Sequence, residues 1–455
     1  MSKLWDKKQG NQVDRTWFFE FTASEDRAYD DYLIPFDIKC NLAQNAMLHK
    51  IGIISESDFV SIHEALVGYF KVWMDGKFQL TNDDEDVHSA IENRLTSDCG
   101  DAGKKIHTGR SRNDQVQTDI RLFTKSKLMV VVQDWLQIVE ILTQIAQTNK
   151  GVFFCGYTHT QPAMPTSVDA WAYGYIDMIL SDISSIQHAF EQIDRNPLGS
   201  AAGFGVPYLA IDRELTTSLL NFSQTQHAVT SVQSSRGKLE KQVAQSLESG
   251  MFSFNRMASD VIHFANSEVG IVELSEDQTS GSSIMPQKRN PDAWELIRSG
   301  YGQISGHVNQ LSMSGVNLIT GYHRDLQITK KHLIDAIQSS LKINYAVIHC
   351  LNGLRFNEDR CEKSLTNEVF ATHKAIQSVL DGSNFRDAYQ QSTKTDDSEL
   401  ESHKSKLKNS YHVKGFPGNP AQEFYQNRIR SYQQWVDDRI LSQKKADEHL
   451  FNLSK

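Results

Sequence analysis

Apolar residues recur every three or four positions along four long segments of the chain. These segments cover residues 128–145, 171–193, 239–264 and 294–311. Such spacing gives a helix one apolar face, and several long helices of this kind bury their faces by packing together as a bundle. Alternating strand patterns are nearly absent. The sequence therefore predicts an all-α fold with a long central helical bundle.

The 455 residues exceed what one ordinary core encloses, so we expect the chain to divide into domains. Residues 1–110 hold shorter helical patterns, for example at 57–73, and predict an N-terminal helical domain. Residues 111–360 carry the long amphipathic segments of the central bundle. Residues 361–455 are more polar and predict a small helical C-terminal domain, in which the stretch at 391–412 looks exposed or mobile.

Composition and charge exclude several classes of protein. With 39% hydrophobic and 23% charged residues, the chain has the balance of a soluble globular protein. A net charge of -9 leaves no electrostatic basis for binding nucleic acid or an anionic membrane. No apolar run approaches the length of a membrane span, and the first residues lack the apolar core of a signal peptide. The five scattered cysteines predict reduced thiols in a cytoplasmic protein.

A polar loop at residues 281–292 (GSSIMPQKRNPD) is the first candidate for chemistry. Asn290 and Pro291 are typical of a helix start, with Asn as the N-cap and Pro in the first helical position. Backbone N–H groups at a helix start attract anions, and Lys288 and Arg289 lie beside it. The loop predicts a site for a carboxylate or phosphate. Taken by itself, a solvated surface loop is the alternative.

A second polar segment, HTGRSRNDQ, begins at His107. Ser111 and Asp114 match a capping-box pattern and are followed by a long helical segment. Arg112 and Asn113 would then lie at the helix N-terminus, where their side chains suit recognition of a carboxylate. A simple helix cap with surface arginines is the alternative.

A third polar segment covers residues 158–165 (THTQPAMP). Its two prolines predict an irregular loop, and Thr166 with Asp169 matches a helix cap. His159 is a candidate general acid or base, because the unperturbed pKa of histidine lies near physiological pH. An ordinary surface histidine is the alternative.

The sequence EDVH at residues 85–88, with Glu92 one turn later, offers too few ligands for a metal site. A helical ion pair between His88 and Glu92 is favoured there. None of the polar segments has metal-ligand spacing or a nucleophile motif. Their side chains converge only if several helices, or several subunits, bring them together. The set favours acid–base chemistry on an anionic substrate, without a metal or other cofactor.

The loop at 281–292 is similar to the signature loop of the aspartase/fumarase superfamily of lyases. HTGRSRNDQ closely resembles the form of the second motif found in the argininosuccinate lyase family. Further similar segments lie at 85–92, 196–203, 321–327 and 385–389. The resemblance implies reversible cleavage of argininosuccinate to arginine and fumarate. It also implies three domains and a homotetramer, in which the central helices form one multi-helix core and three subunits build each active site.

The resemblance assigns catalytic roles to residues in and near the loop at 275–291. Ser282 would be the base, and His159, polarised by Glu295, the partner acid. Lys288 and Asn290 would stabilise the charge that develops on the carboxylate. The implied substrate-binding residues are Asn41, His88, Arg112, Asn113, Thr158, Ser283, Asn290, Tyr322, Gln327 and Lys330.

The chain departs from the family pattern near its N-terminus. Cys40, Asn41 and Gln44 stand where the family usually has Gly, Ser and His. Asn41 is larger than Ser, and Cys40 does not replace Gly where a positive φ is needed. These changes leave two alternatives open: a sister lyase that releases fumarate from a related substrate, or a structural protein without turnover. The presence of every residue expected to do the chemistry argues against the second.

Overall fold

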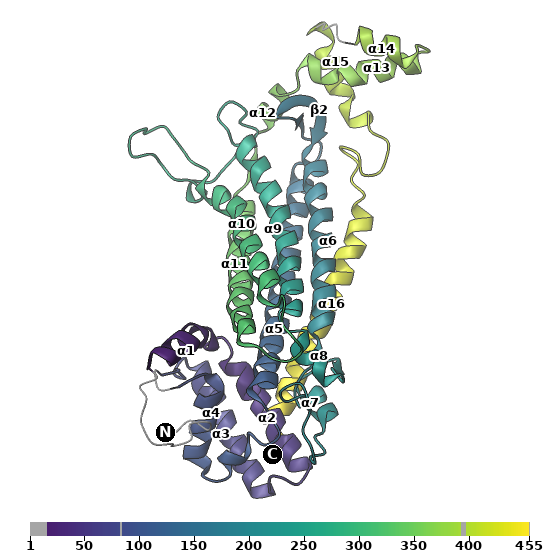
Figure 1. Ribbon diagram of the computed structural model, residues 1–455. Helices are drawn as coiled ribbons and strands as arrows, with labels where there is room; N and C mark the ends of the chain where they lie inside the picture. Colours follow the sequence, from purple (N-terminus) through teal and green to yellow (C-terminus); the bar gives the residue numbers. More distant parts are fainter. Residues whose placement is uncertain (1–15, 82–83, 393–396, 455) are drawn as a thin grey trace.

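Five long helices run side by side along the middle of the molecule (Figure 1). The structure is a computed structural model that describes residues 16–81, 84–392 and 397–454. The five helices are α5 (Arg112–Thr148), α6 (Val168–Ile193), α9 (Lys238–Phe264), α10 (Asp292–Ser314) and α11 (Ile328–Asn352). Four of them contain the four amphipathic segments, so the predicted helical bundle is confirmed.

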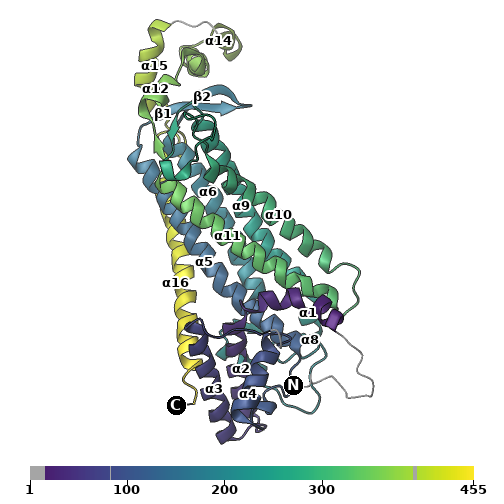
Figure 2. The same cartoon turned by 90° about the vertical axis from the view of Figure 1, so that its left-hand side faces the viewer.

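Shorter elements lie at the two ends of the bundle (Figures 1 and 2). One end carries α1 (Thr16–Asp30), α2 (Ile34–Lys50), α3 (Glu56–Met74), α4 (Val87–Cys99), β3 (Arg195–Asn196), α7 (Arg213–Leu219), β4 (Gln224–Thr225) and α8 (Val229–Ser234). The other end carries β1 (Phe153–Thr158), β2 (Gln161–Ser167), β5 (Val272–Glu273), β6 (Arg355–Phe356), α12 (Glu358–Lys363), α13 (Ala371–Leu380), α14 (Phe385–Gln391) and α15 (Leu400–Lys406).

The last helix, α16 (Gln422–Leu450), runs back along the bundle and ends beside the N-terminal helices (Figure 2). His63 Nε2 of α3 lies 3.1 Å from the carbonyl oxygen of Leu450. The division of the chain at residues 110 and 360 stays a prediction. α16 nevertheless joins the last part of the chain to the first.

Close approach of the bundle helices depends on one small residue. The Trp135 ring of α5 is fully buried, and its Nε1 donates to Asn344 of α11 at 3.0 Å. On α9, a Cβ atom at Gly250 would lie 2.3 Å from this ring. Glycine is therefore required where α9 crosses the Trp135 ring.

The loop expected at residues 158–165 is instead part of a β-hairpin. β1 and β2 pair antiparallel, and His159 and Thr160 form the two-residue turn between them. Both turn residues have positive φ values, 54° and 59°, as a type I′ turn demands. The prolines misled the prediction, because a two-stranded sheet has only edge strands and these tolerate proline.

Two of the three predicted helix starts are shifted by one residue. Ser111 and Asp114 form the predicted capping box at the start of α5, which confirms that start. Ser167, not Thr166, caps α6 by accepting a hydrogen bond from the N–H of Ala170. Asn290 does not cap α10, because its backbone pairs with Ser280 in an antiparallel bridge and the helix begins only at Asp292.

Three further expectations concern the backbone at Cys40, the state of the cysteines and the exposure of the stretch at 391–412. Cys40 lies inside α2 without a positive φ, so no glycine is needed at this position. All five cysteines are free thiols. The stretch at 391–412 is not wholly exposed, because α15 forms within it and Leu407 is buried; residues 393–396 of this stretch lie outside the described residues.

α5 is the one described helix that is long and apolar enough to cross a membrane by length and composition. Yet 61% of its most apolar window is buried inside the protein. This burial is that of a core helix in a soluble protein.

Candidate active site

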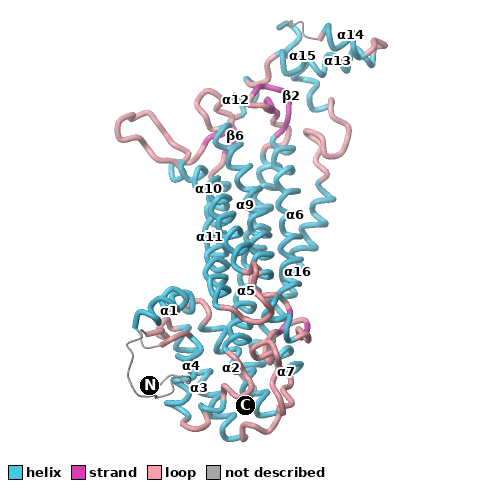
Figure 3. The backbone as a smooth tube through the Cα atoms, in the orientation of Figure 1, coloured by secondary structure: helices cyan, strands magenta, loops and turns pink. Residues whose placement is uncertain are grey.

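The predicted site residues fall into three groups that lie far apart within one chain. Thr158 and His159 are at the tip of the β1–β2 hairpin. The second group lies on the long loop that leads into α10 and projects from the bundle (Figure 3). The third group is at the opposite end of the bundle, where α4 and α5 start and α11 begins (Figure 1).

Ser282 lies in the second group, with two backbone N–H groups directed at its side chain. Its Oγ accepts hydrogen bonds from the N–H of Met285 at 3.1 Å and of Ile284 at 3.4 Å. Hydrogen bonds to an oxygen favour its anionic form, so the loop lowers the cost of forming a serine alkoxide. The ends of the loop are held together by the backbone pair between Ser280 and Asn290.

His159 and Glu295 are both exposed. The described residues provide no hydrogen bond or ion pair between these two side chains within one chain. The polarisation of His159 by Glu295 therefore stays a prediction. The left-handed turn fixes the position of His159 at the hairpin tip, where another subunit can reach it.

The third group begins with the N-terminus of α5. Arg112 forms ion pairs with Asp86 at 2.8 Å and Glu85 at 3.4 Å, which ties α5 to the start of α4. Asp114 Oδ2 accepts the N–H groups of Gly199 at 2.9 Å and Ala201 at 2.8 Å. HTGRSRNDQ is thus joined to the glycine-rich segment at 196–203. Burial raises the pKa of Asp114 to about 6, although these backbone hydrogen bonds oppose the rise.

Asn41 is buried, with 1% of its surface exposed, and both ends of its amide have partners. Its Oδ1 accepts from Arg110 at 2.8 Å, and its Nδ2 donates to the backbone oxygen and Oδ2 of Asp37. The predicted contact between Asn41 and substrate is untested. In the conformation described, Asn41 holds Arg110 in place.

His88 is part of the same buried cluster and does not pair with Glu92, contrary to the prediction. Its Nδ1 lies 2.9 Å from Asp37 and 3.6 Å from Asp119. His88 meets these carboxylates because α2 carries Asp37 and α5 carries Asp119 against the first turn of α4. Helical spacing does not reveal such long-range contacts.

The surroundings shift the pKa values of the two carboxyl groups in this cluster in opposite directions. Burial alone would lower the pKa of His88, but Asp37 raises it above the ordinary value. Burial would raise the pKa of Asp37, but His88 and Arg110 hold it below its usual range. Burial and the Asp37 carboxylate raise the pKa of Asp119 well above its usual range. The cluster therefore contains a His88–Asp37 ion pair beside an Asp119 whose surroundings favour the protonated form.

Asp37, His88 and Asp119 place three metal-ligand atoms within 4.8 Å of one another. Asp37 Oδ1 already accepts hydrogen bonds from His88 and, at 2.5 Å, from Gln115 Nε2. These contacts balance the buried charge of Asp37 without a metal ion. We therefore assign the cluster a structural role.

The stability of Asp119→Asn relative to the wild type is expected to increase as pH rises above about 4, the pKa of an unfolded aspartate. In the wild type the folded state keeps the Asp119 proton that the unfolded state loses, so the free energy of unfolding falls with increasing pH. The difference in the free energy of unfolding between Asp119→Asn and the wild type should widen by up to about 1.4 kcal/mol for each pH unit in this range. Urea unfolding at several pH values measures it.

Asp37→Asn is the matched comparison, because the same change removes the partner of His88. This variant should lose stability at neutral pH. Parallel stability curves for wild type and Asp119→Asn would show that Asp119 is ionised in the folded protein.

The residues of the α11 region have partners from other elements. Lys330 is buried and pairs with Asp30 at 2.5 Å and Asp26 at 2.8 Å, both on α1. Gln327 Nε2 donates to the carbonyl oxygen of Thr22 at 2.7 Å. The structure thus places these side chains at one end of the bundle, with α1 against them.

Sequence reasoning missed several buried polar residues beside the predicted ones. The guanidinium of Arg236 lies 4.8 Å from the ring centre of Tyr322. Asp37 and Asp119 were missed as partners of His88. No local pattern identifies such residues, since each is distant in sequence from the residue it contacts.

Comparisons with known proteins agree with the helical bundle. Residues 20–306 match the model of a family described as "Lyase". The argininosuccinate lyase of Thermotoga neapolitana is 38% identical over 85% of this chain and 96% of its own length. That of Phocaeicola vulgatus is 36% identical over 85% of this chain and 86% of its own length.

Solved structures show the same fold at lower sequence identity. An EDDS lyase in complex with formate matches 98% of this chain and 96% of its own with a TM-score of 0.81 at 18% identity. The class II fumarase of Schistosoma mansoni matches 86% of this chain and 91% of its own with a TM-score of 0.69 at 16% identity. The fold is therefore that of the aspartase/fumarase superfamily of lyases. Within it, the chain belongs to the argininosuccinate lyase family.

Proposed function

We propose that the protein catalyses reversible cleavage of argininosuccinate to L-arginine and fumarate by anti elimination. Membership of the argininosuccinate lyase family supports the choice of substrate. The observation that carries the chemistry is the pair of backbone N–H groups on Ser282 Oγ. They stabilise the alkoxide that a serine base requires near neutral pH.

The elimination moves one proton and breaks one C–N bond. Ser282 takes the Cβ proton of the succinyl group, and the electrons of that bond move onto the adjacent carboxylate. Lys288 and Asn290 stabilise the resulting dianion. The bond to the guanidine nitrogen then breaks as the double bond of fumarate forms, and His159 supplies the partner acid. Arginine and fumarate are released, and no cofactor is needed for this sequence.

We further propose a homotetramer in which three subunits build each active site. The groups that carry His159, Ser282 and Lys330 are far apart in one chain, although one reaction needs them together. The bundle also exposes large apolar side chains that a monomer would leave in water. These are Phe252 on α9, Leu296 and Met313 on α10, Val316 and Ile319 after α10, and Tyr345 on α11.

The loop at 281–289 would close over the substrate within this assembly. Ile284 is 83% exposed and Met285 40% exposed, beside a serine that needs protection from water. Burial of these two apolar side chains upon closure would help to drive the movement.

Substrate binding is proposed for the remaining positions of the family pattern. Asn113, Thr158, Ser283, Tyr322 and Gln327 are each at least partly exposed and therefore accessible to a ligand. Others act from buried positions. His88 and Lys330 would fix the shape of the site through their ion pairs, and Asn41 would act through Arg110.

A related fumarate-releasing lyase is the second candidate. Asn41 favours it, because Asn41 uses its whole amide on Arg110 and Asp37 in place of the serine that the family pattern has there. We also propose the cytoplasm as the location, since all five cysteines are free thiols.

Purified protein mixed with argininosuccinate should release fumarate, which is followed by its ultraviolet absorbance. Adenylosuccinate and aspartate are the matched test substrates, because their cleavage also yields fumarate. Turnover of either one alone would select the second candidate. No fumarate from any of the three at high protein concentration would leave only a structural role.

A further inference from the structure

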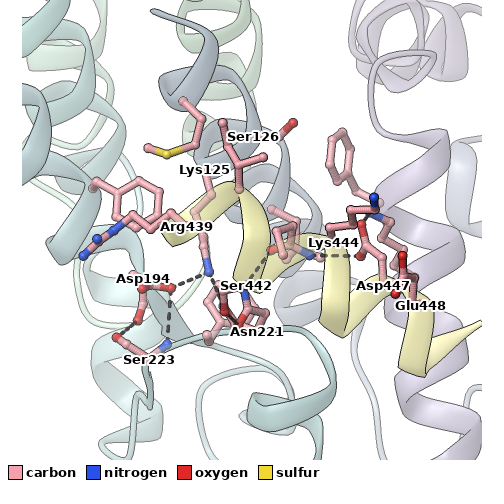
Figure 4. A pocket seen from close by; sticks show the side chains of 18 of the residues that line it. Lys125, Ser126, Asp194, Asn221, Ser223, Arg439, Ser442, Lys444, Asp447 and Glu448 are labelled. Atoms are coloured by element: carbon pink, nitrogen blue, oxygen red, sulfur yellow. Dashed lines mark hydrogen bonds and ion pairs between the residues drawn. The ribbon is translucent and has the colours of Figure 1, made fainter. Parts of the chain in front are cut away.

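A cavity of about 950 Å³ lies between α16 and the N-terminal half of α5 (Figure 4). α2, α3, the end of α6 and the segment at 221–223 complete its walls. Its volume is that of a small-molecule site. None of the residues proposed for the lyase reaction lines it. We propose that this cavity binds a small amphipathic carboxylate, with the anionic head between Lys125 and Arg439 and the apolar tail along an aromatic wall.

The wall suited to an apolar tail is formed by aromatic and aliphatic side chains. The lining includes Phe190, Phe222, Met129, Val130 and Ile440. Val130 is 39% exposed and Ile440 36% exposed, so apolar surface remains open to a ligand. Burial of such surface is the main driving force for binding an apolar tail.

Lys125 is a buried cation in the cavity wall. Its ammonium donates to the Asp194 carboxylate and, at 2.5 Å, to the carbonyl oxygen of Asn221. Lysine carries three donors, so one remains for a ligand. The same ammonium lies 4.5 Å from the ring centre of Phe222, and burial lowers its pKa despite the opposing effect of Asp194. A ligand carboxylate beside Lys125 would stabilise the charged form of its ammonium group.

Arg439 supplies the second cation. Its guanidinium carbon lies 4.2 Å from the ring centre of Trp435 and 5.4 Å from that of Phe190. One hydrogen bond, from Nη1 to the carbonyl oxygen of Trp435 at 3.3 Å, uses one of its five donors. No carboxylate of the described residues forms an ion pair with it, so its remaining donors suit a carboxylate ligand.

The charges around the cavity favour an anion over a neutral or cationic ligand. Four cations face three carboxylates in the lining: Lys39, Lys125, Arg439 and Lys444 against Asp194, Asp447 and Glu448. Two of the carboxylates are already paired, Asp194 with Lys125 and Asp447 with Lys39. Positive charge among the lining residues is thus in excess by one, although Glu191 and Asp438 outside the lining also act on Arg439 and the whole chain carries a net charge of -9. In the view of Figure 4, Lys125, Arg439 and Asp194 lie to the left, and Lys444, Asp447 and Glu448 lie to the right.

Binding is tested by isothermal titration calorimetry of the full-length protein with octanoate. Octylammonium and 1-octanol are the matched probes with the same tail. Octanoate should bind at least about tenfold more tightly than either, since hydrogen bonds to a charged partner contribute that much. Equal affinity for the three probes, or no binding of octanoate, would overturn the proposal. Octanoate would also fail to bind if another copy of the chain filled the cavity.

Two variants locate the site. Arg439→Gln should weaken octanoate binding about tenfold, and Ile440→Trp should weaken it by filling the cavity. Arg430→Gln is the control, because it removes the same charge from an exposed position of α16 outside the lining and should bind octanoate as the wild type does. Unchanged binding in both cavity variants, with wild-type circular dichroism, would place the octanoate elsewhere. The outcome does not depend on lyase activity.

Discussion

Ser282→Ala should lower kcat for argininosuccinate by roughly 10²- to 10⁴-fold, the usual contribution of a general base. The methyl group cannot accept the Cβ proton, and the N–H groups of Met285 and Ile284 lose the oxygen on which they converge. The subunit assembly should be unchanged, because this side chain is partly exposed on a loop. Steady-state kinetics and sedimentation velocity measure the two properties.

Ser283→Ala is the matched control, since it removes the neighbouring hydroxyl from the same loop. We expect it to raise KM with a much smaller effect on kcat, because Ser283 is proposed to bind substrate and not to take the proton. A loss of activity below tenfold in Ser282→Ala would rule out Ser282 as the base.

Two inactive variants should regain activity when their subunits are mixed. Ser282→Ala and His159→Asn alter groups that lie in different parts of one chain and, in the proposed assembly, reach each site from different subunits. Hybrids formed by unfolding and refolding the two variants together should include sites in which both groups are intact. Fumarate release should then rise well above that of either parent.

The control for this experiment is a mixture of Ser282→Ala with Ser282→Gly. Both variants lack the same group, so no hybrid contains a complete site and activity should stay at the level of the parents. If the first mixture is equally inactive while gel filtration shows hybrids, the residues act within one chain or not in the same site.

The bundle was predictable because its information is local. The apolar faces of α5, α6, α9 and α10 each repeat over many turns, and a repeat of this length has no other solution than a packed helix. The capping box at Ser111 was predictable for the same reason, since its two side chains are three residues apart. Resemblance to the family supplied what periodicity does not give, namely the roles of Ser282 and His159.

Long-range contacts could not be predicted in this way. His88 was expected to pair with Glu92 one helical turn away, but the pairing with Asp37 joins residues 51 positions apart. The turn at His159 was missed because neither of its residues is glycine, although both have positive φ. Non-glycine residues adopt this conformation only when the surrounding structure imposes it. Such contacts become visible only when the packed helices define which side chains meet.

α16 has a consequence for how the protein is made. Its last turns contact α2 and α3 through Lys39–Asp447 and His63–Leu450, so residues from the beginning and the end of the chain share one interface. The N-terminal helices leave the ribosome before α16 and remain without these partners until α16 has been made. A chain without α16 would leave apolar surface of α2, α3 and α5 uncovered. Loss of α16 would therefore leave this surface open to aggregation.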